Sequence, residues 1–301
     1  MPEPSLVNKK TKGPPIPKKK TKMSIMIIAK QNHAGIKSAK TVYKKLQDIA
    51  DVHLDLSTAL RIRKPKGTAV KKFSGDLIIT LGGDGTFLWT AYQAQVPILP
   101  VRIEGHGFLC TIDYKDFLNK IPQILSGNYK IEKRMRLQCT ELNDKILRKI
   151  FKKTYPHALN EIAFSRKRPS KVLRLEFKIG DTVFDLVGDG VLFTTPSGSS
   201  AYAASAGGPV IDHSLEAISI VPLYPFNSHI RPIIIPADKK VEVVLKSNNC
   251  ALIIDGHTGE YAKEGTKFYI ERGDPVKIAH LGDHQFYEKY KKVFVSHNIF
   301  P

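Results

Sequence analysis

The chain has 301 residues, of which 42% are hydrophobic, and this length favours two folded domains over one. No apolar run approaches the roughly 20 residues of a membrane-spanning helix, and residues 1–22 lack the apolar stretch of a secretory signal. Three widely spaced cysteines without a C-x-x-C pair imply neither a disulfide framework nor a zinc site. Composition therefore predicts a globular protein that stays in the cytoplasm and does not bind a membrane.

The formal net charge of +19 is unevenly distributed. Residues 1–22 hold seven lysines and one glutamate among prolines, which predicts a basic disordered tail and leaves +13 on the rest of the chain. A second basic segment, RIRKPKGTAVKK at 61–72, is either a solvated loop or a surface that attracts a polyanion. Nucleic-acid binding would explain the charge. No helix-turn-helix, zinc-finger or RNP pattern accompanies it, so we expect no nucleic-acid partner.

The first third of the chain alternates short apolar runs with helical patterns. Residues 114–125 add a helical face that Pro122 kinks or shortens. Strands separated by helices favour a doubly wound α/β domain with a parallel sheet, which we place at 23–134. The pattern predicts strands at 24–29, 52–56, 76–81 and 97–101, and helices at 37–50 and 86–95.

After residue 134 the pattern changes to short alternating strands. In KVLRLEFKI, residues 171–179, apolar and charged side chains alternate as in a strand with one buried face. These runs predict a β-rich domain at 135–280, antiparallel and sandwich-like, with one helix at 197–208. An amphipathic segment within 281–301 is expected to pack back on the first domain. The further strands are predicted at 182–187, 190–195, 217–222, 241–246, 251–254, 267–271 and 275–279.

The stretch DLIITLGGDGTFLWTA places a glycine-rich loop between a predicted strand and a predicted helix. Ligands bind at this position in parallel sheets, and the free N–H groups of a helix start attract anions. The spacing matches neither G-x-G-x-x-G nor a Walker loop, and Asp84 stands inside the cradle. A carboxylate beside phosphate holds Mg²⁺ or accepts a proton from an attacking hydroxyl, whereas in a plain turn it caps the helix. The predicted phosphate loop is Gly82, Gly83, Gly85 and Thr86.

Two further segments carry polar groups suited to a nucleotide. LVGDGVLFTTPSGSSAYAASAGGPVID, residues 186–212, combines a second Gly-Asp-Gly with hydroxyls at a predicted helix start, where Tyr202 could stack on a base. Close packing of a strand and a helix is the alternative explanation for its small residues. In HALNEIAFSR, residues 157–166, Asn160 and Glu161 interrupt an apolar strand, a pattern that solvent-facing positions also produce.

Together, LGGDGTFLWTA, ALNEIAF, DGVLFTTPSGSSAYAASAGGPVID and LIIDGH resemble the ordered motifs of the NAD kinases, which phosphorylate the 2′-hydroxyl of the adenosine ribose of NAD. The glycine loop alone is also similar to that of lipid kinases and phosphofructokinases, so a lipid or sugar kinase is the alternative. The resemblance implies an α/β domain followed by a β-rich domain with the site between them. It also implies a homodimer or homotetramer whose sites can borrow residues from a neighbouring subunit. The donor would be ATP or inorganic polyphosphate, with Mg²⁺ carried on the donor phosphates and not held by the protein alone.

The same resemblance assigns roles to individual residues. It implies that Asp84 is the general base at the ribose hydroxyl. PVRIEGHGFL at 100–109 departs from the family pattern Gly-Ile-Asn-x-Gly-x-Leu-Gly-Phe-Leu by introducing Arg102 and His106. Val187 stands where arginine is often found, and the last motif ends in a histidine where glutamine is usual. The implied NAD-binding residues are Asp84, Gly85, Asn160, Glu161, Lys171, Asp189, Ser200, Ala201, Tyr202, Ala203, Ala204, Ser205 and His257.

Overall fold

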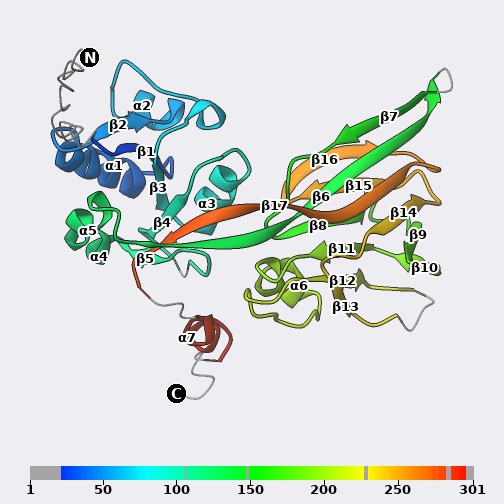
Figure 1. Cartoon of the computed structure of the whole chain (residues 1–301). Coiled ribbons are helices and arrows are strands. Elements are labelled where there is room, and N and C mark those ends of the chain that lie inside the picture. The colour runs from blue at the N-terminus through cyan, green and yellow to red at the C-terminus, as the bar shows by residue number, and fades with distance from the viewer. Residues whose placement is uncertain (1–21, 106, 147–148, 227–229, 283–285, 296–301) are drawn as a thin grey trace, which may run out of the picture.

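The structure, a computed structural model, describes residues 22–105, 107–146, 149–226, 230–282 and 286–295. Figure 1 shows an α/β lobe and a β-rich lobe side by side, with two long strands that run from one lobe into the other. Residues 1–21 of the predicted basic tail, and His106, lie outside the described residues.

The α/β lobe is built on parallel strands in the order β4-β3-β1-β2, with the short β5 beside β4. Helices connect these strands, which confirms the predicted α/β class. The strands are β1 (Ser24–Ala29), β2 (Asp51–Leu54), β3 (Leu77–Gly82), β4 (Ile98–Arg102) and β5 (Ile112–Asp113). The helices are α1 (His33–Leu46), α2 (Leu56–Arg61), α3 (Asp84–Ala91), α4 (Tyr114–Asn119) and α5 (Ile121–Leu125), with a 3-10 turn η1 (Val70–Lys72).

Both faces of this parallel sheet are covered, which explains why its central strands are apolar throughout. Successive side chains of a strand point to opposite faces. Ile25 and Ile27 of β1 therefore pack in one core cluster with residues of α1, α4 and α5. Met26 and Ile28 pack in another with Phe87 of α3. The sheet thus holds α3, and with it the glycine loop, on one defined face.

Two helices differ in extent from their sequence patterns. α1 begins four residues before the predicted start because the Asn32 side chain accepts the backbone N–H of Gly35 at 2.9 Å and caps the helix. It ends at Leu46, so Ile49 lies beyond the helix and is 51% exposed. The predicted helix at 114–125 is the pair α4 and α5, with Pro122 in the first turn of α5, where no hydrogen bond is lost.

The β-rich lobe is a sandwich of antiparallel strands, as predicted. One layer has the strand order β13-β12-β11-β8-β15-β16, and the other includes β10-β9-β14-β17. Phe164 of the first layer lies 5.1 Å from Phe268 of the second, measured between ring centroids. The strands are β7 (Lys149–Thr154), β8 (Glu161–Arg166), β9 (Leu173–Ile179), β10 (Thr182–Gly188), β11 (Gly190–Thr194), β12 (Ala217–Leu223), β13 (Ile233–Pro236), β14 (Val241–Leu245), β15 (Cys250–Ile254) and β16 (His257–Ala262).

A ribbon of two long antiparallel strands, β6 (Lys130–Ile146) and β17 (Lys267–His280), joins the lobes (Figure 1). β17 pairs with β14 in the β-rich lobe and then, at Ile278, lies parallel to Ile98 of β4. The runs predicted as two strands at 267–271 and 275–279 are one strand, because the register shifts after Gly273 without ending the pairing. β6 runs through residue 134, so the change of sequence pattern there does not coincide with a break in secondary structure.

The remaining elements are short. The predicted helix at 197–208 contains only a 3-10 turn, η2 (Gly198–Ser200), and α6 (Tyr202–Ser205), because the backbone at Ala201 is not helical. After β17 come α7 (Phe286–Tyr290) and a π-helical turn, η3 (Lys291–Val295). None of the helices in the described part of the chain has the length and apolar character needed to cross a bilayer. All three cysteines are buried free thiols.

Candidate active site

Asp84 is the first residue of α3, directly after the loop that ends β3. Its carboxylate turns toward the loop of residues 107–110. Asp84 Oδ2 accepts the backbone N–H of Phe108 at 2.8 Å, and Oδ1 accepts that of Leu109 at 2.9 Å. Asp84 therefore does not cap α3, whose N-cap is Gly83, and its carboxylate is fixed by a neighbouring loop instead. Each of its oxygens keeps a lone pair that a further donor can use.

The glycines of the phosphate loop differ in what they do. A Cβ on Gly82 would lie 2.2 Å from Thr86 Oγ1, so only glycine allows the strand and the helix to approach so closely. Gly85 is exposed, and a Cβ there would meet no heavy atom within 4 Å. The backbone at Gly85 thus borders open space at a helix N-terminus, where an anion can approach.

Positive groups lie behind Asp84. Arg102 pairs through two nitrogens with the Asp113 carboxylate, and this hydrogen bonding lowers the pKa of Asp113. Burial lowers the pKa of Lys289, the charge of Arg134 adds to that shift, and the charge of Asp84 opposes it. Lys289 therefore offsets part of the repulsion between Asp84 and a bound phosphate, whereas the charge of Arg102 is largely balanced by Asp113. The Arg102 departure from the family pattern has a partner in this structure.

A second group of polar residues lies at the start of β8. The Asp255 carboxylate accepts three successive backbone N–H groups, among them those of Asn160 and Glu161, at 2.7 and 3.1 Å. On the other side, Thr194 Oγ1 donates to the carbonyl of Asn160 at 3.0 Å. Gly198 packs against the same backbone so closely that a Cβ would lie 2.1 Å from Asn160 O. The backbone under Asn160 and Glu161 is thus held from both sides.

The side chains of these two residues are buried but incompletely paired. Asn160 Oδ1 and Glu161 Oε2 have no hydrogen-bond partner among the described residues. Burial, with the Asp255 charge adding, raises the pKa of Glu161 to about 7. A buried polar atom without a partner costs free energy, so this pair marks a place for a ligand that supplies polar groups.

The raised pKa of Glu161 predicts a pH-dependent stability. A carboxyl whose pKa is higher in the folded state stabilises the fold at low pH, and this contribution is lost as pH rises through about 7. We expect the free energy of unfolding of the natural chain to fall relative to Glu161→Gln by about 2 to 3 kcal/mol between about pH 5 and pH 8. Urea denaturation of both proteins across this range measures the difference. Parallel pH dependences in the two proteins would contradict the raised pKa.

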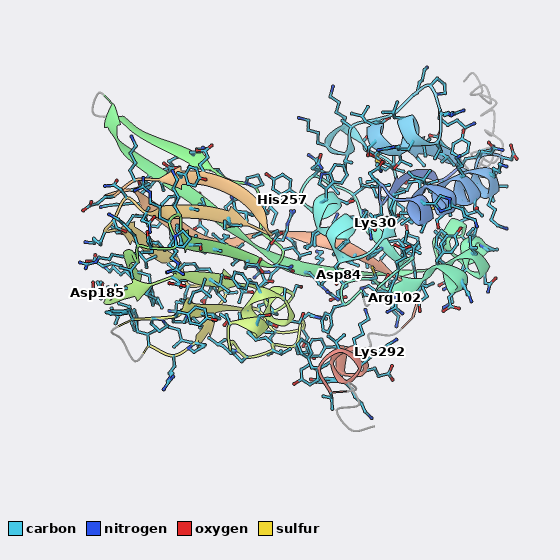
Figure 2. The ribbon with its side chains drawn as sticks, turned by 180° about the vertical axis from the view of Figure 1, so that it is seen from behind. Lys30, Asp84, Arg102, Asp185, His257 and Lys292 are labelled. Carbon is cyan, nitrogen blue, oxygen red and sulfur yellow. The ribbon has the colours of Figure 1, made fainter. Side chains whose placement is uncertain are left out.

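Helix α3 brings the two groups of residues together. Phe87 of α3 belongs to the same core cluster as Leu159, the residue before Asn160. At the end of α3, the ring of Tyr92 lies 5.8 Å from the ring of His257, which occupies the usual glutamine position. In Figure 2, His257 lies on the side of the β-rich lobe that faces the lobe carrying Asp84. The candidate site therefore lies between the lobes.

Two predicted residues lie elsewhere in the same chain. Asp189 forms an ion pair with Arg166 at 2.9 Å, at the opposite end of β8 from Glu161. An extended strand of this length separates the two ends by about 16 Å. Lys171 follows the same far end of β8 and is exposed. The structure thus does not bring Asp189 and Lys171 to Asn160 and Glu161 within one chain.

The residues at 200–205, which were predicted to bind NAD, differ in how far their side chains are exposed to solvent. Ala203 is buried in a cluster with Leu192 of β11, so its methyl group faces the protein. Ala201 and Ala204 are half-buried, whereas Tyr202 is 47% exposed and Ser205 is exposed. The hydroxyl of Ser200 donates to the carbonyl of Ser197 at 3.3 Å. The exposed side chains of this run are the ones available to a ligand.

Four residues that contact the site were given no role in the sequence analysis. Asp255 lies within the LIIDGH motif, where the Asp-Gly pair is the sequence signal of a turn. The structure shows this turn, with a positive φ of 47° at Asp255. Phe108 and Leu109 act through backbone N–H groups, which no side-chain pattern shows. Lys289 comes from the last helix, and its role depends on tertiary contacts alone.

Comparisons with known proteins identify the family of the chain. Residues 20–129 match the family model of the ATP-NAD kinase N-terminal domain, and residues 159–279 match that of the ATP-NAD kinase C-terminal domain. An NAD kinase of Methanothermobacter thermautotrophicus is 35% identical over 256 residues, which cover 82% of this chain and 86% of the relative.

Two solved structures share the fold. Yeast NADH kinase complexed with NADH has a TM-score of 0.83 and 22% identity, covering 93% of this chain and 90% of its own. An NAD kinase from Archaeoglobus fulgidus in complex with ATP has a TM-score of 0.69 and 21% identity, covering 90% and 97%. With both family domains matched in order, the chain belongs to the NAD kinase family and is a kinase that transfers phosphate to NAD.

Proposed function

We propose that the phosphate acceptor is the 2′-hydroxyl of the adenosine ribose of NAD, that the donor is ATP, and that Asp84 accepts the hydroxyl proton. The observation that carries this proposal is the placement of the Asp84 carboxylate. It lies in a glycine loop at a helix N-terminus, fixed by two backbone N–H groups, in the lobe that faces Asn160 and Glu161. A carboxylate placed in this way is suited to a hydroxyl that attacks phosphate.

Asn160 and Glu161 are proposed to bind hydroxyl groups of NAD. Their buried oxygens, Asn160 Oδ1 and Glu161 Oε2, would each accept a hydrogen bond from the substrate, and this pairing removes the cost of leaving them unsatisfied. The contacts of Asp255 and Thr194 to the backbone fix both residues before NAD arrives. Binding therefore orders little of the protein, which favours affinity.

Phosphate transfer depends mainly on alignment, because its transition state is loose and requires little covalent help. Backbone N–H groups at the start of α3 would hold phosphate oxygens in line with the ribose oxygen. The ribose oxygen forms the new bond to phosphorus, its proton goes to an Asp84 oxygen, and ADP leaves with the electron pair of the broken bond.

Mg²⁺ carried on the donor phosphates would supply charge neutralisation. The donor set fits an ion bound mainly by phosphates and water. Within the described residues, no three His, Cys, Asp or Glu side chains gather where they could hold a metal ion. Asp84 already accepts two N–H groups from the chain, which leaves it suited to at most a minor share of the coordination.

Asp189 and Lys171 are proposed to belong to the NAD site of a second copy of the chain. Their separation from Glu161 within one chain supports this assignment, as does the homo-oligomeric state that the family resemblance implies. Light scattering during size-exclusion chromatography, with activity measured in the eluted peak, tests it. A fully active monomer would exclude the assignment.

The purified chain tests the proposed reaction directly. NAD⁺ and NADH are each incubated with Mg²⁺ and either ATP or inorganic polyphosphate, and the product is located by phosphorus NMR. We expect a 2′-phosphate on the adenosine ribose with ATP as donor, in line with the ATP complex of the Archaeoglobus relative. Diacylglycerol and fructose 6-phosphate serve as control acceptors. A product that forms with polyphosphate but not with ATP, or a phosphate at another hydroxyl, would refute the proposal.

A further inference from the structure

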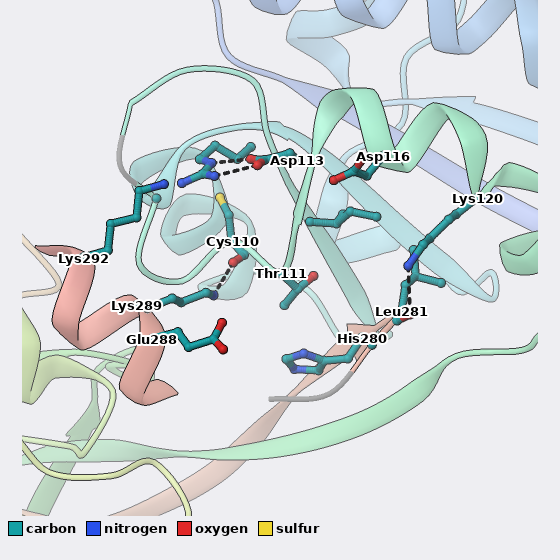
Figure 3. A pocket seen from close by; sticks show the side chains of 14 residues that line it. Cys110, Thr111, Asp113, Asp116, Lys120, His280, Leu281, Glu288, Lys289 and Lys292 are labelled. Atoms are coloured by element: carbon teal, nitrogen blue, oxygen red, sulfur yellow. Dashed lines mark hydrogen bonds and ion pairs between the residues drawn. The ribbon is translucent and has the colours of Figure 1, made fainter. Parts of the chain in front are cut away.

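The loop of residues 107–110 is held from two sides. On one side it donates two backbone N–H groups to Asp84. On the other, Lys289 Nζ donates to the carbonyl of Phe108 at 3.1 Å and to that of Cys110 at 2.5 Å. Lys289 and Cys110 both line a pocket of about 430 Å³, and Figure 3 shows the hydrogen bond between them. The C-terminal helix thus contacts the same loop that fixes the carboxylate.

One peptide group connects the two charges. The carbonyl of Phe108 and the N–H of Leu109 belong to the same peptide unit. That unit accepts a hydrogen bond from the Lys289 ammonium and donates one to Asp84 Oδ1. Hydrogen bonds in such a chain polarise one another, so the ammonium strengthens the N–H group that holds the carboxylate. Lys289 is therefore linked to Asp84 by a specific bonded path.

Aromatic packing seats the helix that carries Lys289. The Phe286 ring lies edge-on to the Phe108 ring at 6.0 Å and to the His213 ring at 4.5 Å. His213 follows the PVID segment of the β-rich lobe, so α7 contacts both the loop at Asp84 and the opposite lobe. Phe286 and Lys289 lie on the same short helix. The packing of the Phe286 ring therefore also fixes the position of Lys289 near the two carbonyls.

We propose that Lys289 is a positioning residue for the phosphate transfer: through the loop of residues 107–110 it fixes the direction of the Asp84 carboxylate. The inference rests on the proposed role of Asp84 as the base. It makes α7, which lies outside both matched family domains, part of the catalytic apparatus. A helix that only ties down the C-terminus would contribute to stability but not to the orientation of Asp84.

The test compares Lys289→Met, which removes the donor, with Lys289→Arg, which keeps the charge and the N–H groups. We expect Lys289→Met to lower kcat by about 10- to 100-fold, because small displacements of a reacting group have effects of this size. The KM for NAD should stay within about two-fold, since the proposed NAD contacts lie in the other lobe. Lys289→Arg should recover most of the loss. Lys292→Met, on the adjoining turn, removes a charge that makes no hydrogen bond to the described residues of the loop, and it should leave kcat unchanged.

A double-mutant cycle that combines Lys289→Met with Asp84→Asn tests whether Lys289 acts through the Asp84 carboxylate. If Lys289 acts through the carboxylate, Lys289→Met should lower the residual activity of Asp84→Asn by no more than about two-fold. Amide exchange gives a readout that does not depend on activity: the N–H groups of Phe108 and Leu109 should exchange faster in Lys289→Met than in Lys292→Met. If Lys289→Met does not fold, Lys289→Gln, which keeps a shorter donor, replaces it in the same cycle.

The possible results separate the two proposals. Full activity of Asp84→Asn would refute the base assignment, whatever Lys289 does. A large loss in Asp84→Asn together with an additive loss from Lys289→Met would refute only the positioning role, as would unchanged amide exchange in the loop.

Discussion

Asp84→Asn should lose about 10²- to 10⁴-fold in kcat while it keeps its affinity for NAD, because an amide cannot take the proton that the ribose hydroxyl releases. The substitution also turns an NH₂ group toward one of the N–H groups of Phe108 and Leu109, so the loop loses one acceptor. Steady-state kinetics with ATP and calorimetric titration with NAD measure the two quantities separately.

Asp84→Asn affects both the loop of residues 107–110 and the proton transfer, so a control must separate the two effects. Lys289→Met loosens the loop and leaves the carboxylate intact, so it should lose less activity than Asp84→Asn. If a folded Asp84→Asn protein has the same kcat as the natural chain, Asp84 is not the base. Equal losses in both variants would show that a loosened loop removes the whole contribution of Asp84.

Gly198→Ala should lower kcat/KM for NAD by about 100-fold, although it adds a single methyl group. The new Cβ would lie 2.1 Å from Asn160 O and 2.6 Å from Asn160 Cα, and these backbone atoms are held in place by Asp255 and Thr194. Relief of the clash must therefore displace the pair of residues proposed to bind NAD. Overpacking of this kind also costs about 1 to 3 kcal/mol of stability, which thermal denaturation reports.

Gly282→Ala is the matched control for Gly198→Ala, because an added Cβ at Gly282 meets no heavy atom within 4 Å. We expect it to keep both activity and melting temperature. If Gly198→Ala binds NAD as tightly as the natural chain, Asn160 and Glu161 are not the contacts proposed above.

The sequence predicts the α/β lobe well because its strands are buried on both faces. The apolar runs that become β1, β3 and β4 leave little choice of structure, and the glycine loop follows directly from the end of β3. The polar interruption at Asn160 and Glu161 is visible in the sequence, but only the family resemblance gave the pair a predicted role in binding NAD. Both residues are buried, which excludes the solvent-facing position that the pattern alone would favour.

Other features depend on contacts that no local pattern contains. β6 carries charges along most of its length, and its pairing with β17 comes from residues more than a hundred positions away. The helix expected at 197–208 is mostly irregular, because η2 packs against the backbone of Asn160. The separation of Asp189 from Glu161 follows from the antiparallel register of β8 and β11, which residue identities do not specify.

The strand that passes between the lobes has a consequence for how the chain is made. The short β5 covers only the end of β4, at Val101 and Arg102, and the rest of that sheet edge gains a neighbour only when Ile278 of β17 pairs with Ile98. During synthesis part of the β4 edge therefore stays unpaired until residues near 278 have left the ribosome. Open edges of this kind invite pairing with other chains, and such distant contacts form slowly. We therefore expect this protein to need a chaperone most while its first lobe has been synthesised and β17 has not.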